Sequence, residues 1–229
     1  MMFRCRAISP EQKQERRRAI LDAALQLFQE MSFDAIGINE VAKRAGVAKG
    51  TVYLYFKTKE ELFLALQSEA FESWFDEMDA RLSEMQAAHE SCTIDRFVDL
   101  VEHSTQDRPA LVRLIAISHA ILERNIDFSA AMAFKQMLCE RTFKTGSLLE
   151  ACLPFLKPGA GAQLILRIYT LVIGIQTVAE PTPVVRQAIE KPGLECFRID
   201  FSDEFSDVLK TLLNGLAYQA AAIAAPTGK

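Results

Sequence analysis

Residues 49–59 bring together side chains that can bond to a nucleic acid. Lys49 can reach a phosphate or a guanine edge, and Thr51 can bond to a phosphate or touch a thymine methyl group. Gly50 lets the two backbones approach closely. The residues expected to read bases are Asn39, Lys49, Thr51 and Leu54. The residues expected to position the protein on phosphates are Gly50, Tyr53, Tyr55 and Lys59.

These side chains need a rigid support, and the sequence around them predicts one. Apolar residues at helical spacing predict a short helix over 38–45 and a second over 49–56, with Val52 and Phe56 buried. Gly46 permits a sharp turn between them. Two short helices joined in this way are typical of a helix-turn-helix, whose second helix enters a major groove about 12 Å wide.

Two longer helices flank this pair. Ser9–Gln12 has the residues of a capping box with proline at the first helical position, and it predicts a helix that buries Ile20, Leu27 and Phe28. Thr58–Glu61 forms a second capping box, which opens a long helix running past Met85. Three helices therefore lead into a long fourth one.

The rest of the chain also has a helical period. Helices are expected over 94–106, 109–124, 129–153, 161–180 and 204–224, and the proline-rich stretch 181–203 is expected to be a mobile loop. No alternating pattern predicts a sheet. The prediction is an all-α fold of about nine helices, with a helix-turn-helix domain over 1–60 and a larger helical domain over 61–229.

Composition limits the function. The formal net charge is −4, divided into +4 over residues 1–60 and −8 over the remainder, so a basic head precedes an acidic body. The five cysteines show no disulfide framework. No apolar run has the length of a membrane span, and the N-terminus lacks a signal-peptide core, so a cytoplasmic protein without a membrane role is expected. The histidines have none of the spacings of zinc ligands, and we expect neither metal nor cofactor.

The run from Ala45 to Leu62, with the pattern A-G-V-x-K-G-T-x-Y-x-Y-F-x-x-K-E-x-L, resembles the DNA-binding module of TetR-family transcriptional regulators. The likeness covers about 50 residues. It implies a homodimer with two helices per subunit in a four-helix interface, and a ligand cavity among the middle helices. Gly37 and Ala48 stand where the family often has a hydroxyl residue, so both short helices lack that N-cap. Replacement of such a cap by Ala typically costs about 1 kcal/mol and by Gly a few tenths.

The implied cavity needs apolar walls with a few polar groups to orient a ligand. An ordinary packed core would use the same residues, so both interpretations stay open here. The candidate ligand-binding residues are Trp74, Met78, Phe97, His103, His119, Phe134, Met137, Arg141, Tyr169 and Thr170. The apolar helices 161–180 and 204–224 are the candidates for the dimer interface.

The resulting hypothesis is a ligand-responsive regulator that binds a palindromic DNA operator as a repressor and is released by a small, largely apolar effector. Ligand binding is expected to tilt the long fourth helix and change the spacing of the two heads. An activator is an open alternative. The rival from another class is a helical enzyme or carrier without a DNA role. No nucleophile–base arrangement is visible, so we expect no enzymatic activity, and the effector and operator are beyond what the sequence specifies.

Overall fold

The computed structural model of the chain describes residues 9–88 and 92–224, and it is built of α-helices with short 3-10 turns and no strand within these ranges. Residues Arg4 and Arg6, which contribute to the basic N-terminal charge, lie outside the described residues. The predicted all-α fold is confirmed. The described part holds ten α-helices, one more than the expected nine or so, because part of 181–203 is helical.

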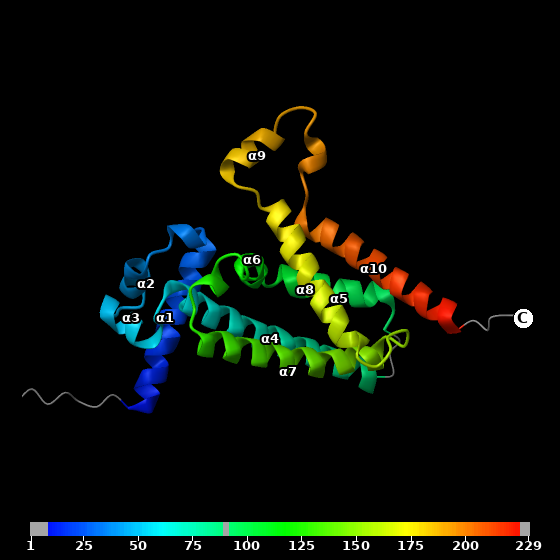
Figure 1. Cartoon of the computed structure of the whole chain (residues 1–229), viewed down its shortest axis with the longest axis horizontal. Coiled ribbons are helices and arrows are strands. Elements are labelled where there is room, and N and C mark those ends of the chain that lie inside the picture. Colours follow the sequence, from blue (N-terminus) through cyan, green and yellow to red (C-terminus); the bar gives the residue numbers. More distant parts are fainter. Residues whose placement is uncertain (1–8, 89–91, 225–229) are drawn as a thin grey trace, which may run out of the picture.

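The head consists of α1 (Pro10–Glu30), α2 (Ile38–Arg44) and α3 (Lys49–Tyr55), with the 3-10 turn η1 (Phe33–Ala35) between α1 and α2. The expected capping box at Ser9 is formed, since its hydroxyl accepts from the Gln12 amide and the Gln12 side chain accepts from the Ser9 amide. Ile20, Leu27 and Phe28 are buried as predicted, together with Val52 and Phe56. The head occupies one end of the molecule (Figure 1).

The body is formed by α4 (Lys59–Ala87), α5 (Ile94–Gln106), α6 (Pro109–Ile117), α7 (Phe128–Cys152), α8 (Ala160–Ala179) and α10 (Phe201–Ala224). α4 runs out of the head and packs against α7 along the long axis of the molecule, and α8 packs on α6, α7 and α10 (Figure 1). Buried residues of α4 belong to the cores of both the head and the body. The boundary predicted at residue 60 falls in the first turn of this helix and stays a prediction.

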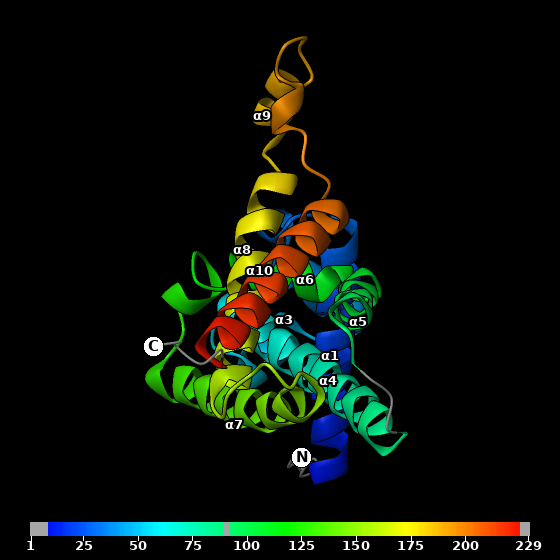
Figure 2. The same cartoon turned by 90° about the vertical axis from the view of Figure 1, so that its right-hand side faces the viewer.

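Two segments differ from the sequence expectation. The predicted helix 109–124 is two pieces, α6 and the 3-10 turn η2 (Leu122–Arg124), separated at Ser118, whose hydroxyl donates to the Gln67 side chain of α4. The stretch 181–203 holds α9 (Pro183–Ile189) and η3 (Glu195–Phe197), and α9 stands away from the body in both views (Figures 1 and 2).

No apolar run of membrane-spanning length is expected from the sequence, but by length and hydropathy α8 is the one helix among the described residues that could cross a membrane. Core helices of water-soluble proteins meet the same criteria. Leu164, Ile165, Ile168 and Val172 are buried against the body core. The packing of α8 on three other helices accounts for this buried apolar stripe, whereas Leu166 and Val178 on its other side are exposed.

Head and body share a core. Leu114 of α6 and Leu122 of η2 are fully buried among residues of the head, next to Leu62 and Phe63 of α4. Arg113 of α6 donates to the carbonyl of Phe28 at 2.7 Å, near the C-terminus of α1. A shift of α6 or η2 therefore moves atoms that pack inside the head.

Candidate functional sites: a helix-turn-helix and a body cavity

The turn between α2 and α3 is a Schellman motif. The amide of Val47 donates to the carbonyl of Ala42 at 3.0 Å, and the amide of Gly46 donates to the carbonyl of Lys43 at 3.3 Å. Gly46 has a φ of 67°, a left-handed conformation that favours glycine. Val47 then packs against the head core. This geometry fixes the direction in which α3 leaves the turn.

Helix α3 has one buried side and one open side. Val52 is completely buried, while Lys49, Gly50 and Tyr53 are exposed and Leu54 is 81% exposed. Asn39 is exposed on α2, whereas Thr51 and Tyr55 are half-buried, with Tyr55 packed on the head core. No other part of the described chain covers this side of α3, where Tyr53 is exposed beside Leu54. Neither α2 nor α3 has a side-chain N-cap bond, which agrees with Gly37 and Ala48 at those positions.

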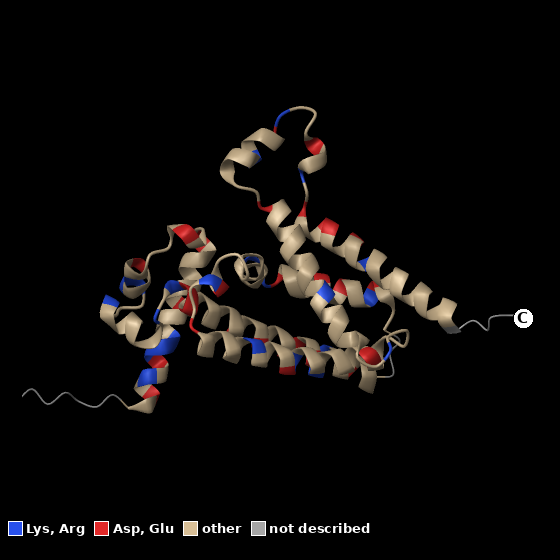
Figure 3. Cartoon of the chain, in the orientation of Figure 1, with Lys and Arg blue, Asp and Glu red and all other residues tan. Residues whose placement is uncertain are grey.

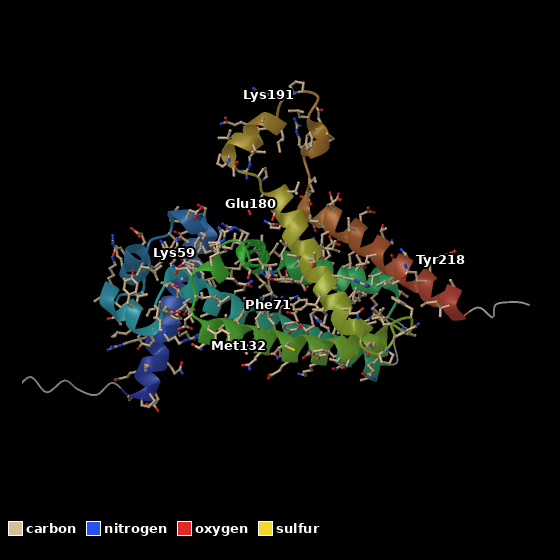
Figure 4. The ribbon with its side chains drawn as sticks, viewed as in Figure 1. Lys59, Phe71, Met132, Glu180, Lys191 and Tyr218 are labelled. Carbon is tan, nitrogen blue, oxygen red and sulfur yellow. The ribbon has the colours of Figure 1, made fainter. Side chains whose placement is uncertain are left out.

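Lys59 lies differently from the other expected phosphate-binding residues. Its ammonium donates to the carbonyls of Phe33 and Ile36 at 2.8 and 3.0 Å, and it lies 3.9 Å from the centre of the Phe33 ring. Burial lowers the pKa of Lys59, and the nearby carboxylates of Asp34 and Glu60 oppose that change. Figure 4 labels Lys59 within the head. Its hydrogen bonds hold the connection between α1 and α2, so the ammonium faces the protein and not the surface beside α3.

Basic residues lie on more than one helix of the head. Figure 3 shows Lys and Arg along α1 and around the α2–α3 turn. Lys43 and Lys49 are exposed, while Arg44 is paired with Glu30 at 2.6 Å. Exposed cations next to a protruding helix provide the electrostatic attraction that a DNA phosphate backbone requires.

The second site is a cavity of about 660 Å³ inside the body, between α4, α5, α6, α7 and α8. This volume is in the range of pockets that hold drug-sized ligands. Its walls are largely apolar, with Phe71 labelled inside the body in Figure 4. The polar side chains on its lining are Ser104, Thr105, Arg108, His119, Lys135, Cys139, Thr142, Tyr169 and Thr170.

The cavity lining includes four of the predicted ligand-binding residues: Trp74, His119, Tyr169 and Thr170. The Trp74 indole donates to the Ser104 hydroxyl at 3.0 Å, and the Tyr169 hydroxyl lies 3.3 Å from His119 Nε2. Burial raises the pKa of Tyr169, a hydrogen bond with Ser118 lowers it, and the charge of Glu123 raises it further. These contacts hold the polar groups in place at the cavity wall.

The other six predicted ligand-binding residues lie outside this lining. Met78, Phe97 and Phe134 are buried in the body core, and Met137 packs against it. His103 is exposed on α5 and bonds to the carbonyl of its own helix at Asp99. Arg141 pairs with Asp76 and Asp79, which joins α7 to α4. All six lie on the expected helices but on faces that do not reach the cavity.

Sequence reasoning missed two cations of the lining, Arg108 and Lys135. Arg108 precedes α6 and pairs with Glu77 at 2.5 Å. Lys135 shares one face of α7 with Leu138, Cys139 and Thr142, at positions i, i+3, i+4 and i+7, and all four line the cavity. A lysine at the end of an otherwise uncharged helical stripe was the signal that could have identified it.

Comparison with known proteins supports the arrangement. Residues 20–66 match the family described as bacterial regulatory proteins of the tetR family, and residues 68–220 match the tetracyclin repressor-like C-terminal domain. A fatty acid metabolism regulator protein of Bacillus subtilis is 33% identical over 84 residues, which are 37% of this chain and 43% of that protein. The repressor KstR of Rhodococcus jostii is 40% identical over 65 residues, which are 28% of this chain and 31% of that protein. The similarity thus spans less than half the length of these relatives.

Solved structures share the fold across most of the chain. The fatty acid degradation regulator FadR of Bacillus halodurans covers 88% of this chain and 96% of its own, with 21% identity and a TM-score of 0.55. FadR of Bacillus subtilis, solved in complex with stearoyl-CoA, covers 86% of this chain and 96% of its own, with 21% identity and a TM-score of 0.52. With both domains matched in order along one chain, this protein belongs to the TetR family of bacterial transcriptional regulators.

Proposed function

We propose that this protein is a cytoplasmic, ligand-responsive repressor that binds a palindromic operator as a homodimer and is released by a largely apolar effector. The DNA-binding part of the proposal rests on the open side of α3. Leu54 is 81% exposed there, beside exposed Lys49 and Tyr53, and fully buried Val52 anchors the helix on its other side. A braced helix with such a surface fits a major groove. The DNA-contacting residues we propose are Asn39, Lys49, Gly50, Thr51, Tyr53, Leu54 and Tyr55, without Lys59.

The effector is proposed to bind in the 660 Å³ cavity, among Trp74, His119, Tyr169 and Thr170. The Bacillus subtilis FadR structure holds stearoyl-CoA, and a cavity with largely apolar walls suits a ligand with a hydrocarbon chain. Release of DNA requires that the ligand bind more tightly to the conformation with low DNA affinity.

The dimer is proposed to form through the outer faces of α8 and α10. Each of these helices carries a glycine in its interior, Gly174 and Gly215, on an exposed face where an added Cβ would meet no atom within 4 Å. An interior glycine costs a helix about 1 kcal/mol relative to alanine, and no packing within the subunit accounts for it. Close approach of a partner helix does account for it. Two-fold symmetry would place two α3 helices about 34–36 Å apart, which is one turn of DNA.

The proposal is tested by selecting genomic fragments with the purified protein and titrating the bound fragments in gel-shift assays at several salt concentrations. Phosphate contacts predict that log K falls by about 0.9 per neutralised phosphate for each tenfold rise in salt. A helical carrier or enzyme without a DNA role predicts no binding at low salt. Effector action is tested by adding acyl compounds to the complex, and equal effector affinity for free and DNA-bound protein would contradict it.

The interface is tested by sedimentation velocity of Gly174→Gln and Gly215→Gln, with Gly174→Ala as the matched small control. Since nothing within the subunit contacts these positions, each glutamine variant should fold normally. We expect monomers for the glutamine variants and dimers for the alanine control. Dimers in all three variants would rule out this interface.

A further inference from the structure

The cavity is cationic as well as apolar. Among the described residues that line it, Arg108 and Lys135 are basic, His119 is titratable, and no side chain is a carboxylate. We propose that the cavity takes an amphipathic anion whose acidic group is received by Lys135 and His119, and that this contact releases Glu123 and so passes the signal to the head. The inference rests on the proposed function for its DNA readout, but the binding part can be tested without DNA.

The cavity has two cationic ends. Arg108 precedes α6 and His119 follows it, so the nine residues of α6 separate them by about 14 Å. At the first end the Arg108 guanidinium is already held by Glu77 at 2.5 Å and bonds to the Ser104 carbonyl at 3.5 Å. At the second end, Lys135 is 48% exposed and pairs with Glu123 at 2.8 Å. A lysine side chain that is half-exposed and flexible can turn to a ligand more easily than a guanidinium fixed by two bonds.

Glu123 is the centre of the second end. Its Oε1 accepts from Lys135 at 2.8 Å and lies 3.3 Å from the Ser118 hydroxyl oxygen, and its Oε2 lies 3.1 Å from His119 Nδ1. Burial raises the pKa of Glu123, but Lys135 and His119 together outweigh burial, so the pKa lies below its ordinary value. An anionic ligand must therefore compete with an ionised carboxylate for the same two partners.

Glu123 is directly connected to the head. It belongs to η2, and the preceding residue Leu122 is fully buried in the head core. Two residues later, the carbonyl of Asn125 accepts from the Thr58 hydroxyl at 2.8 Å, and the Asn125 amide donates to Glu60 at 3.2 Å. Thr58 is the N-cap of α4 and lies three residues after the last residue of α3.

The N-cap of α7 extends this connection between Glu123 and the head. Asp127 caps α7 by accepting from the amide of Ala130 at 2.8 Å, and the same carboxylate pairs with Lys57. Residues 118–127 therefore join the cationic end of the cavity to the junction of α3 and α4. If a ligand takes Lys135 and His119 from Glu123, this segment keeps its N-cap contact with α7 at Asp127 but loses the ion pair with Lys135, so η2 can shift against the head core and change the position of α3 relative to the body.

The binding step can be followed with the single tryptophan of the chain, Trp74, because it lies on the cavity wall. Three probes share one hydrocarbon chain: palmitate carries a carboxylate, cetyl alcohol is uncharged, and palmitoyl-CoA carries phosphates. The variants are Lys135→Gln and Glu123→Gln. The matched control is Lys144→Gln, on the same helix but paired with Asp79 and outside the cavity lining.

The two variants should act in opposite directions on the ligand. Lys135→Gln should weaken binding of a charged probe about tenfold, because it removes a charge-assisted bond. Glu123→Gln should strengthen it by about two- to fivefold, because it removes the competing carboxylate. Binding of cetyl alcohol should be the same in all variants. An effect on palmitate assigns a carboxylate ligand, and an effect confined to palmitoyl-CoA assigns a phosphate-bearing one.

Both variants should change operator affinity in the same direction. Both variants break the Lys135–Glu123 pair, so each should weaken operator binding by ligand-free protein by about two- to fivefold, and Lys144→Gln should not. Equal affinity of all variants for both charged probes would overturn the inference while leaving the proposed repressor intact. Failure of the unaltered protein to bind any DNA would instead contradict the proposed function, and the ligand titrations would still decide the anion site.

Discussion

Replacement of Lys59 by methionine separates two roles for this lysine. From its place after the helix-turn-helix, Lys59 was expected to bind a phosphate, whereas the structure engages its ammonium with the carbonyls of Phe33 and Ile36. Methionine keeps a stem of similar length but provides no donor. We therefore expect Lys59→Met to lower the stability of the head.

The magnitude follows from the contacts that are lost. A hydrogen bond to a charged group contributes about 1.5–3 kcal/mol, but Lys59 is half-buried, so water replaces part of the loss at the two carbonyls. The cation lies 3.9 Å from the centre of the Phe33 ring, which adds about 0.5–1 kcal/mol. A net loss of about 2 kcal/mol is reasonable, and it corresponds to a fall in Tm of about 4–8 °C for a chain of this size.

The assay is thermal unfolding together with DNA binding at several salt concentrations, and Lys49→Met is the matched control. Lys49 is exposed at the start of α3, so its replacement should change stability by less than about 0.5 kcal/mol. It should also reduce the salt dependence of DNA binding by about one phosphate contact. If Lys59→Met instead keeps the Tm of the unaltered protein and loses one phosphate contact, the reasoning from the structure is refuted.

Three further outcomes can be measured. Gly50→Ala should stabilise the protein by about 0.4–1 kcal/mol, because an added Cβ would meet no atom within 4 Å, and it should weaken DNA binding. Unchanged DNA affinity would exclude a close approach of the DNA backbone to residue 50. Gly46→Ala should destabilise it by about 1–2 kcal/mol, because φ is 67°, and a higher Tm would contradict this. The hydrogen-bonded ion pair with Lys57, and to a smaller extent the hydrogen bonds from Ala130 and Ser129, hold the pKa of Asp127 well below its ordinary value. This carboxylate therefore stabilises the fold above about pH 4 and loses that effect in stronger acid. Asp127→Asn keeps an N-cap but not the ion pair, so urea titrations should show lower stability at neutral pH and a difference that shrinks in acid; a constant difference would count against the pair.

The head could be predicted because its signals are local. The turn glycine at 46, the buried pair Val52 and Phe56, the capping box before α1 and the Thr58 N-cap of α4 lie within one or two helical turns of the residues they organise; at α4 the reciprocal bond of the predicted capping box is replaced by one from the Lys57 amide to Glu61. Helix propensity, caps and the 3.6-residue period act over such distances. The open face of α3 follows directly, since the buried residues of a short helix determine which residues remain outside.

The cavity could be predicted only as a place among the middle helices. Its lining comes from five helices, and which face of each one turns inward depends on packing between residues far apart in the chain. Met78, Phe97 and Phe71 are alike in apolar character and are all buried in the body core, but only Phe71 reaches the cavity. Period and composition do not distinguish a residue that fills the core from one that lines a cavity.

The direction of long polar side chains also depended on tertiary contacts. Caps, turns and the helical period are local properties, so the all-α architecture and the helix-turn-helix could be predicted from the order of residues. Packing between helices, by contrast, turns Lys59 toward the α1–α2 connection, places Lys135 on the cavity wall beside Glu123, and buries Leu122 in the core of the head. Each of these contacts joins residues at least 12 positions apart or on different helices, and their partners exist only once the helices have packed.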